Sequence, residues 1–529
     1  MHADYTKAFL TFTVQWHSAR TRRQLRRAST AHSAQPRILA SLLPQLAATK
    51  RYREFQLDPR MSPADFRHQV PLSLPTDNAP WVERMVASEP NVLWPGRCQN
   101  FATTAGSTTG HPQIIPVTEA MQDHFMRATR ACFLHATARA KHVEALRGRL
   151  LLIGGNTLQP GARIPSPDNP DAPVTADIAS LAMLLRPDWV ARHYLEPTAK
   201  IALQTNWHAM VKRIRHRDIT ALAGNPHWLT EFSRTVLEKL SHGKLRYTNL
   251  RAVWPYLNCV FHTGAAPESY TTELRRLLGE GVMLHDVYTA AERIYAAQGL
   301  GQSTGLRLLY NVGIYFEFIP LVDFAHARID DLSTQALSLD AIEVGQNYVL
   351  VITTPAGLVR HIPGDIVRIV STAPPRIRPV GQISTQLNLF NENLHAGDLS
   401  NILSELCRNR RWHLSYFHVA PLPFASDLGR IRGCHEWWVE LRPGTRETPT
   451  GPNLAAELDR RLRRDQPAYA ASRENGTLGA PIVRLVMPGA FEHWLKYSHQ
   501  WGGPHKLLAC RNDRRIIDSL AQMARFSKD

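Results

Sequence analysis

Residues 103–110 read Thr-Thr-Ala-Gly-Ser-Thr-Thr-Gly, and His111, Pro112 and Gln113 follow before a helical stretch that begins near Thr118. Five of these eight residues carry a hydroxyl group, and two are glycines. A tight glycine turn directs backbone N–H groups toward one point, and hydroxyls add hydrogen bonds to the oxygens of an anion. The segment is not a Walker A loop, because the Gly-Lys-Ser/Thr ending is absent. It therefore indicates either a phosphate-binding loop or a Ser/Thr-rich surface loop.

Around this segment, helical stretches alternate with short apolar runs. Helices are predicted over 118–144 and 270–278, and the first 70 residues are also expected to be helical. Strands are predicted at four apolar or β-branched runs, over 149–154, 258–262, 349–354 and 366–370. This alternation predicts an α/β fold, in which helices pack on a sheet.

A proline-rich segment at 373–379 predicts a linker between two domains. The expected domains are therefore an N-terminal domain at residues 1–380 and a C-terminal domain at 381–529. The second domain is predicted to be a smaller α+β unit. Its expected helices lie at 399–409 and 454–464, and its expected strands at 436–441 and 482–486.

Three known functional motifs do not apply to this chain. Gly-Gln-Ser-Thr-Gly at 301–305 matches the G-x-S-x-G motif of hydrolases, but that motif needs a strand before it and a helix after it. The strand-like residues 306–310 follow instead, so a hairpin turn is predicted. A dinucleotide fingerprint fails because the third glycine is missing, and no His-Glu-x-x-His pair supports a zinc hydrolase.

The order of several motifs along the chain points to a family. After residues 103–110 come Tyr-Thr-Ala-Ala-Glu at 288–292, Tyr-Phe-Glu-Phe-Ile-Pro at 315–320 and Gly-Leu-Val-Arg-His-Ile-Pro-Gly-Asp at 357–365. This succession resembles that of the acyl-adenylate-forming superfamily, which includes acyl-CoA synthetases, peptide-synthetase adenylation domains and firefly luciferase.

One branch of that superfamily is the most similar, the auxin-responsive acyl-acid amido synthetases and their bacterial relatives in particular. The resemblance to this branch extends from residue 52 to residue 520. Its specific motifs are Asn-Val-Leu-Trp-Pro-Gly-Arg at 91–97, the 315–320 run, Gly-Ala-Phe-Glu at 489–492, and Gly-Gly-Pro-His-Lys at 502–506 followed by Arg-Asn-Asp at 511–513.

The resemblance implies a large N-terminal α/β adenylate-forming domain, a smaller mobile α+β C-terminal domain, and an ATP site in the cleft between them. It implies nucleotide contacts from two loops. The triphosphate residues are Thr103, Thr104, Gly106, Ser107, Thr108 and Thr109, and the residues along the adenine are Thr263, Gly264 and Ala265.

Further site residues follow from the same resemblance. Tyr288 offers a flat face to the adenine, and Asp365 a carboxylate to the ribose hydroxyls. Glu292 has a catalytic role as the ligand of Mg²⁺, a hard cation that prefers oxygen. Lys506 is the catalytic cation that stabilises developing charge during adenylation. Arg378 is expected to be a further nucleotide-binding cation.

Each of these residues also has a structural interpretation. Tyr288 is compatible with a core aromatic, Glu292 with a surface acid, and Asp365 with a turn residue after a glycine. An isolated lysine such as Lys506 is usually solvated. These alternatives stay open at the level of sequence.

Three positions depart from the family pattern. Gln113 stands where a lysine commonly closes the phosphate loop, Ala291 where a serine is usual, and Gln382 where an arginine is common at the hinge. Each change removes a donor or a charge of the kind that supports phosphoryl chemistry. Arg378 and Lys506 are the cations available to compensate, and without compensation the activity would be reduced or lost.

The sequence also suggests residues for the substrates. Acyl-pocket residues are expected within 154–157 and 176–194. The aromatic side chains of 315–318 are expected to be mainly scaffold that lines the acyl side of the cleft, with the glutamate of that run structural. His262 and His285 flank the nucleotide segments, and an unperturbed histidine pKa near 6.5 suits a base for the amine. A structural role for both histidines is the alternative, and no base is assigned.

The predicted function is an ATP- and Mg²⁺-dependent acyl-acid amido synthetase that joins a carboxylic acid to an amine through an acyl-adenylate, with an amino acid as the expected amine. A first alternative uses a thiol acceptor, either coenzyme A or the arm of an acidic carrier protein. A second alternative is a non-catalytic descendant of the fold that binds nucleic acid.

Composition limits these alternatives. The chain has 529 residues and a net charge of +17, with arginine-rich helical stretches at 20–27 and 460–464. Such stretches are suited to phosphate binding or form solvated helix faces, and no nucleic-acid-binding motif accompanies them. No apolar run approaches the ~20 residues that cross a bilayer. Six scattered cysteines and the lack of a signal-peptide pattern predict reduced thiols in a cytoplasmic protein.

Overall fold

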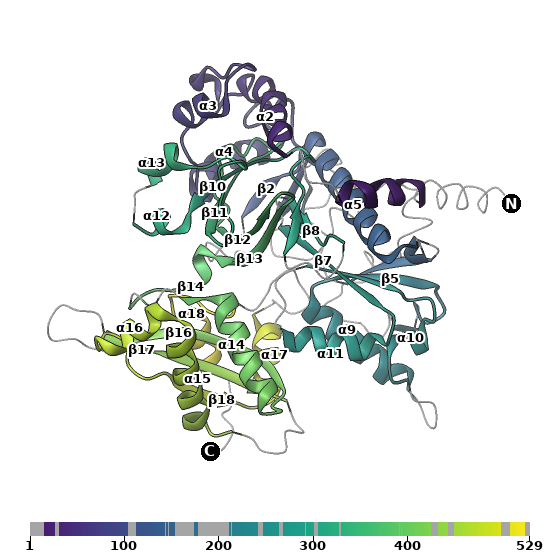
Figure 1. Ribbon diagram of the computed structural model, residues 1–529, viewed down its shortest axis with the longest axis vertical. Helices are drawn as coiled ribbons and strands as arrows, with labels where there is room; N and C mark the ends of the chain where they lie inside the picture. Colours follow the sequence, from purple (N-terminus) through teal and green to yellow (C-terminus); the bar gives the residue numbers. More distant parts are fainter. Residues whose placement is uncertain are drawn as a thin grey trace.

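The computed structural model shows a mixed α/β chain in two parts, which Figure 1 draws from one side. It describes residues 15–26, 31–103, 113–142, 144–146, 148–153, 174–177, 211–212, 214–241, 247–263, 268–290, 293–300, 305–326, 329–390, 392, 394–424, 432–442, 449–498 and 508–523. The N-terminal part is built on one large sheet, and the C-terminal part on a small one.

The large sheet has 10 strands within the described residues, in the order β10-β11-β12-β13-β9-β8-β7-β6-β5-β3. The parallel strands are β3 (Arg149–Ile153), β5 (Ile219–Gly224), β6 (Cys259–Thr263) and β7 (Met283–Ala290). The antiparallel strands are β8 (Arg293–Ala297), β9 (Leu306–Leu308), β10 (Tyr315–Pro320), β11 (Asn347–Thr353), β12 (Asp365–Thr372) and β13 (Pro375–Gln382). The four strands predicted from the sequence are confirmed as β3, β6, β11 and β12.

Helices cover both faces of the parallel end of this sheet. On one face lies α5 (Glu119–Ala140), where Cys132 packs in the same buried cluster as Phe261. On the other face lie α9 (Pro226–Leu240), α10 (Leu250–Val253) and α11 (Glu268–Leu278), where Phe232 packs with Val260. Val260 and Phe261 are consecutive in β6 and point to opposite faces because side chains alternate along a strand. Both predicted helices are confirmed as α5 and α11.

Strands β8 and β9 pair antiparallel on either side of the Gly-Gln-Ser-Thr-Gly motif. Residues 301–304 of that motif lie outside the described residues, and β9 begins directly after Gly305. A strand therefore follows the motif where a hydrolase elbow requires a helix. The hairpin predicted at this position is confirmed.

The linker predicted at 373–379 is wrong. These residues form the turn from β12 to β13 and most of β13 itself, which pairs with both β12 and β9 inside the sheet. Ala373–Pro374 is a cis peptide bond in the turn. The register of β12 and β13 skips Val380 between Gly381 and Pro379, and a proline is tolerated inside a sheet at such a bulge.

A helical layer packs on the β10–β12 end of the sheet. It contains α2 (Ala31–Ala47), η1 (Arg53–Phe55), α3 (Pro63–Gln69) and α4 (Pro75–Val86), in agreement with the helical N-terminus predicted from the sequence. The start of α3 is specified locally: Ser62 and Asp65 form a capping box, and Pro63 occupies the first turn, where its missing N–H is harmless. Nearby lies a three-stranded sheet of β1 (Asn100–Thr103), β2 (Ile114–Pro116) and β4 (Val174–Asp177).

Short elements complete the N-terminal part and its exit. They are η2 (Glu144–Leu146), α12 (Leu321–His326), α13 (Ile329–Leu332), η3 (Ser333–Gln335), η4 (Ile383–Thr385), β14 (Gln386–Leu387) and β15 (Leu394–His395). Directly after β13 comes η4, so the chain leaves the large sheet at Ile383.

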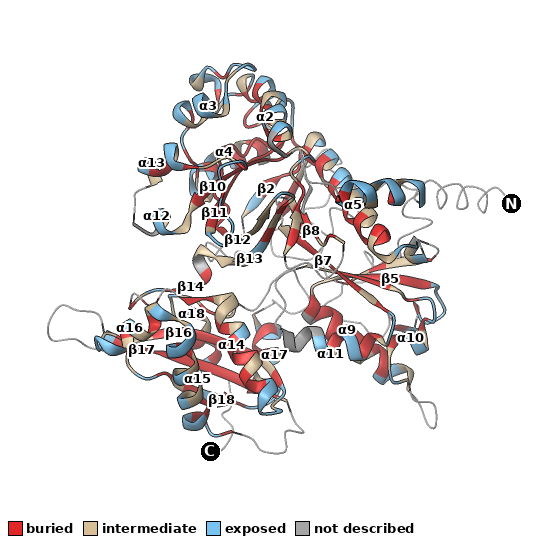
Figure 2. Cartoon of the chain, viewed as in Figure 1, coloured by how far each residue is buried: buried red, intermediate tan, exposed pale blue. Residues whose placement is uncertain are grey.

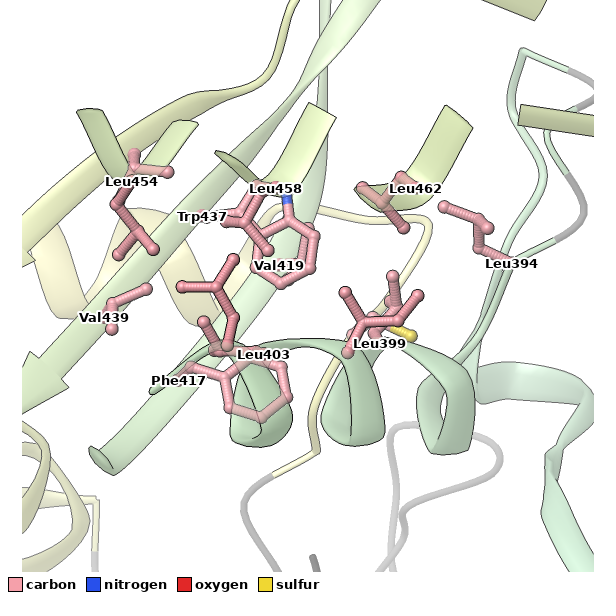
Figure 3. Close-up of a cluster of buried hydrophobic side chains, with 14 of the residues drawn as sticks. Leu394, Leu399, Leu403, Phe417, Val419, Trp437, Val439, Leu454, Leu458 and Leu462 are labelled. Carbon is pink, nitrogen blue, oxygen red and sulfur yellow. The ribbon is translucent and has the colours of Figure 1, made fainter. Parts of the chain in front are cut away.

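The C-terminal part is a three-stranded sheet between two helical layers. Its strands are β16 (Leu414–Phe424), β17 (Arg432–Leu441) and β18 (Ile482–Val486), and its helices are α14 (Ala396–Asn409), α15 (Gly451–Asp465), α16 (Pro467–Glu474), α17 (Ala490–Tyr497) and α18 (Arg515–Ala521). Figure 3 shows Leu403 of α14 and Leu458 of α15 packed around Trp437 of β17. The next residue, Trp438, faces α17 and α18 on the opposite side. The predicted α+β unit is thereby confirmed, and Figure 2 shows its buried strands and exposed outer helix faces.

The arginine run at 460–464 is largely paired with acids of the same unit. Arg461 binds Glu405 and Asp465, and Arg464 binds Asp465 as well. Charges neutralised in this way are less available to the phosphates of a nucleic acid, whose binding depends on free lysines and arginines. None of the helices that the structure describes is both long enough and apolar enough for a membrane span. All six cysteines are buried and free of disulfides.

Candidate active site

The carboxyl ends of the parallel strands meet at one edge of the large sheet. At this edge β6 ends at Thr263 and its neighbour β5 ends at Gly224. Gly224 is required there, because a Cβ atom on it would lie 2.4 Å from the carbonyl oxygen of Ile153. Ligands of open α/β sheets bind outside the carboxyl ends of the strands, so this edge is the candidate site.

Two hydroxyl residues join β6 to β7 at this edge. The Oγ1 atoms of Thr263 and Thr289 lie 2.8 Å apart and share a hydrogen bond. Thr289 follows a shift in register between β7 and β8, which leaves Tyr288 on one side of the irregularity and Thr289 on the other. The sequence-predicted Thr263 is thereby placed beside the Tyr288 segment.

Tyr288 and Asp365 are connected through Tyr295, a residue that the sequence analysis did not single out. The rings of Tyr288 and Tyr295 are stacked, with centroids 4.8 Å apart and planes 23° apart. The Tyr295 hydroxyl donates a hydrogen bond to Asp365 Oδ2, and the Gln382 side-chain amide donates to Oδ1 over 3.4 Å. Tyr288 is 9% exposed. One ring face lies against Tyr295.

Asp365 lies at the start of β12. The loop before it is buried, and its first glycine is held in a confined space. Gly357 has φ +81°, its carbonyl oxygen accepts a hydrogen bond of 2.7 Å from the Tyr52 hydroxyl, and a Cβ atom on it would lie 2.0 Å from the Leu93 carbonyl oxygen. Leu93 belongs to the 91–97 motif, so two distant motifs fit together at Gly357. These contacts fix the backbone of the loop that leads to Asp365.

The same loop is anchored by a buried ion pair. Arg360 Nε lies 3.1 Å from Glu317 Oε2, and both side chains are 0% exposed. The Arg360 guanidinium also donates to the carbonyl oxygens of Arg67 and Val70, at 2.9 and 2.6 Å. Burial raises the pKa of Glu317, while the facing Arg360 lowers it. Glu317 therefore has the structural role that the sequence predicted.

The aromatic residues beside Glu317 do not line a cleft. Tyr315, Phe316 and Phe318 are 1%, 0% and 0% exposed, and they pack into two hydrophobic clusters on the two faces of β10. The expectation that they form the acyl wall is therefore wrong, because β10 is covered on both faces.

The other predicted nucleotide residues are spread more widely. Thr103 is buried at the end of β1, where it pairs with Ile114 of β2. Arg378 is exposed on β13, opposite Arg368 of β12. The remaining predicted residues lie outside the described residues, as do most of the expected acyl-pocket segments; they are Thr104, Gly106, Ser107, Thr108, Thr109, Gly264, Ala265, Glu292 and Lys506.

The histidines near this edge are neutral. Burial, followed by the positive charge of Arg275, lowers the pKa of His262 to about 4, and its Nδ1 lies 3.6 Å from Asp286 Oδ1. Burial also lowers the pKa of His285 well below its usual value. The value near 6.5 assumed from the sequence is too high for both residues, because both side chains are largely removed from water.

Metal-binding side chains and the contacts of the C-terminal unit also bear on the site. The described residues contain no cluster of three or more His, Cys, Asp or Glu side chains that would hold a metal by itself. The C-terminal unit contacts the N-terminal part at α11: Arg442 binds Glu273, which also binds Arg234 of α9, and α14 lies against α11.

Solved structures share this fold. A GH3.15 acyl acid amido synthetase in complex with 2,4-DB aligns with a TM-score of 0.73 at 16% sequence identity, covering 97% of this chain and 98% of that one. A 2-hydroxyisobutyryl-CoA ligase in the postadenylation state aligns with a TM-score of 0.60 at 14% identity, covering 94% of this chain and 93% of that one. The chain has the fold of the acyl-adenylate-forming ligases.

Within that class the family can be stated. Domain models of the GH3 family match in order, the N-terminal domain at residues 20–165, the central domain at 307–382 and the C-terminal domain at 398–515. The chain belongs to the GH3 family. One curated relative, the indole-3-acetic acid-amido synthetase GH3.8 of Oryza sativa subsp. indica, is 24% identical over 92% of this chain and 89% of its own.

Proposed function

We propose that this GH3 protein is an ATP-dependent acyl-acid amido synthetase. It activates a carboxylic acid as an acyl-adenylate and transfers the acyl group to an amine. The observation that supports this proposal most directly is the connected series Tyr288–Tyr295–Asp365, which starts beside the Thr263–Thr289 pair near the carboxyl end of β7. A flat ring face and a buried carboxylate, joined through Tyr295, suit an adenine and a ribose.

The reaction has two steps. A carboxylate oxygen attacks the α-phosphorus of ATP, the bond to the β-phosphate oxygen breaks, and pyrophosphate leaves. The amine nitrogen then attacks the acyl carbon, AMP leaves, and the nitrogen loses a proton. Because both steps develop charge on phosphate or carboxyl oxygens, the protein contributes mainly position and electrostatic stabilisation.

The proposed roles follow the chemistry of each side chain. Asp365 accepts hydrogen bonds from the ribose hydroxyls, and Tyr288 covers one face of the adenine. Residues 103–110 bind the phosphates, and Lys506 stabilises the charge of adenylation. Mg²⁺ supplies charge neutralisation at the phosphates, and Glu292 is its proposed carboxylate ligand. Arg378, exposed on β13, is a proposed second cation for the nucleotide.

Two poses of the C-terminal unit would serve the two steps, with rotation between them. We place the domain boundary near residues 380–381. Strand β13 continues to Gln382, which pairs with Asp365, so we place the start of the pivot at Ile383. The central family model ends at residue 382 and the C-terminal model begins at residue 398, so the proposed pivot lies between the two.

Replacing Asp365 by alanine is expected to weaken ATP binding by about 2–4 kcal/mol, the range for the loss of a charged partner of two hydroxyl groups. Isothermal titration of nucleotide measures this change. The control is Asp518→Ala, whose side chain is 62% exposed on α18. An unchanged dissociation constant in a folded Asp365→Ala protein would show that Asp365 does not contact the nucleotide.

The acceptor is expected to be the amine of an amino acid. Wild-type protein, ATP and Mg²⁺ are first screened with carboxylic acids for pyrophosphate release. An acid that is turned over is then incubated with a pool of amines and coenzyme A together, and the products are weighed. An amide is the expected product. A thioester without amide would favour the thiol-acceptor alternative, and no pyrophosphate with any acid would contradict the enzymatic function.

A further inference from the structure

His124 lies near the start of α5, 0% exposed, and it contacts two backbone segments that are distant in sequence. Its Nε2 lies 3.3 Å from the backbone nitrogen of Ile294 in β8. Its Nδ1 lies 2.9 Å from the carbonyl oxygen of Val312, in the turn before β10. The sequence patterns did not single this residue out, because one histidine in a helix has no motif around it.

These contacts determine the protonation of the ring. The Ile294 N–H can only donate, so Nε2 accepts and has no proton. A carbonyl oxygen can only accept, so Nδ1 holds the proton and donates it to Val312. The ring is therefore the neutral Nδ1–H tautomer, and each nitrogen has a definite task.

Ile294 is closely connected to the candidate nucleotide site. It is the cross-strand partner of Thr289, whose hydroxyl bonds to Thr263. This pair comes directly after the register shift between Tyr288 and Thr289. A bulge interrupts the ladder and leaves backbone groups to find other partners, and the Nε2 of His124 is such a partner for Ile294.

The other end of the His124 contact is a rigid support. Gln35 of α2 donates to the carbonyl oxygens of Tyr310 and Ile314, at 2.6 and 3.0 Å, and accepts a hydrogen bond of 2.7 Å from the Phe316 backbone. Val312 lies between these anchors and is buried. His124 thus ties the irregular part of the β7–β8 hairpin to a turn that is itself held from both sides.

We propose that His124 is a positioning residue for the nucleotide site: through its Nε2 it fixes Ile294, and thereby the register of Tyr288 and Thr289 against Thr263. The proposal rests on the proposed function, because it assigns a consequence for ATP. His124 does not touch the nucleotide. It acts through the backbone of the hairpin whose residues do.

The test separates the two nitrogens. In His124→Gln the side-chain oxygen replaces Nε2 and keeps the acceptor for Ile294, while the donor to Val312 is lost. In His124→Asn the shorter amide nitrogen replaces Nδ1 and keeps the donor, while the acceptor for Ile294 is lost. Each variant loses one buried hydrogen bond, so both should be destabilised to a similar extent. If His124 had a purely structural role, the two variants would lose activity to the same extent.

The expected results differ between the variants. His124→Asn should raise the dissociation constant of ATP or lower the rate of pyrophosphate release by about 10-fold or more, the usual scale for the loss of a supporting residue. His124→Gln should stay within about threefold of the wild type on the same scale. His135→Asn is the control, since it removes another buried histidine of the same helix whose ring does not bond to Ile294. Equal losses in the Gln and Asn variants, or no loss in either, would overturn the proposal.

Hydrogen exchange at the Ile294 amide gives a readout that needs no substrate. This amide should exchange faster in His124→Asn than in His124→Gln or in the wild type, because only the Asn variant lacks its acceptor. Equal exchange in all three proteins would overturn the positioning role whatever the enzyme does. A wild-type protein that binds no ATP would instead contradict the proposed function, while the exchange result would still decide the role of the ring.

Discussion

Replacing Arg360 by methionine is expected to destabilise the fold by about 3–5 kcal/mol, the cost of leaving a buried charge without its partner. Glu317 would then stand 0% exposed without its ion-pair partner. The Arg67 and Val70 carbonyl oxygens would also lose their donor. The free energy of unfolding from a denaturant titration, followed by tryptophan fluorescence, measures the effect.

A surface arginine provides the matched control. Arg410 pairs with Glu457 at 55% and 20% exposure, so Arg410→Met is expected to cost less than about 1 kcal/mol. The double variant Arg360→Met, Glu317→Leu removes both charges and should regain part of the lost stability. If it is no more stable than Arg360→Met alone, the isolated charge of Glu317 is not the cause.

Replacing Lys506 by alanine is expected to slow acyl-adenylate formation by about 10²–10³-fold, the scale for the loss of one preorganised electrostatic group. Capture of a chemically supplied acyl-adenylate by the amine should change far less, because the proposed charge develops only in the first step. Pyrophosphate release and single-turnover amide formation measure the two steps separately.

Lys496 is the matched control for Lys506. It lies in α17 of the same unit, 54% exposed and paired with Glu492, so Lys496→Ala should leave both steps near the wild-type rate. Equal losses of both steps in Lys506→Ala would indicate that this lysine supports the fold of the C-terminal unit. The assignment by family resemblance would then be wrong at this position.

The layered fold could be predicted because its signals are local. The β-branched and apolar runs of β6, β11 and β12 lie between turn residues, and helix α5 begins at a threonine whose side chain caps it. Strand β13 could not be predicted in this way. Its prolines lack N–H donors and read as a linker, and only the bulge at Val380 and the pairing with β12 and β9 make a strand there possible.

The site could be predicted in part for a related reason. Family motifs indicated Thr263, Tyr288 and Asp365, and the fold places Thr263 beside Thr289 and connects Tyr288 to Asp365. Tyr295, which joins Tyr288 to Asp365, belongs to no motif, and its pairing depends on the register of β7 and β8. The low pKa values of His262 and His285 could not be predicted from the sequence either, because they arise from burial in the packed sheet.

The burial of all six cysteines has a practical consequence for measuring the motion of the C-terminal unit. Burial raises the pKa of every one of these thiols, so the reactive thiolate is scarce at neutral pH. A maleimide dye would therefore react mainly with cysteines introduced on the surface, one before Ile383 and one after it. Energy transfer between two such dyes would follow the rotation during turnover, in a protein that keeps all its native residues in the core.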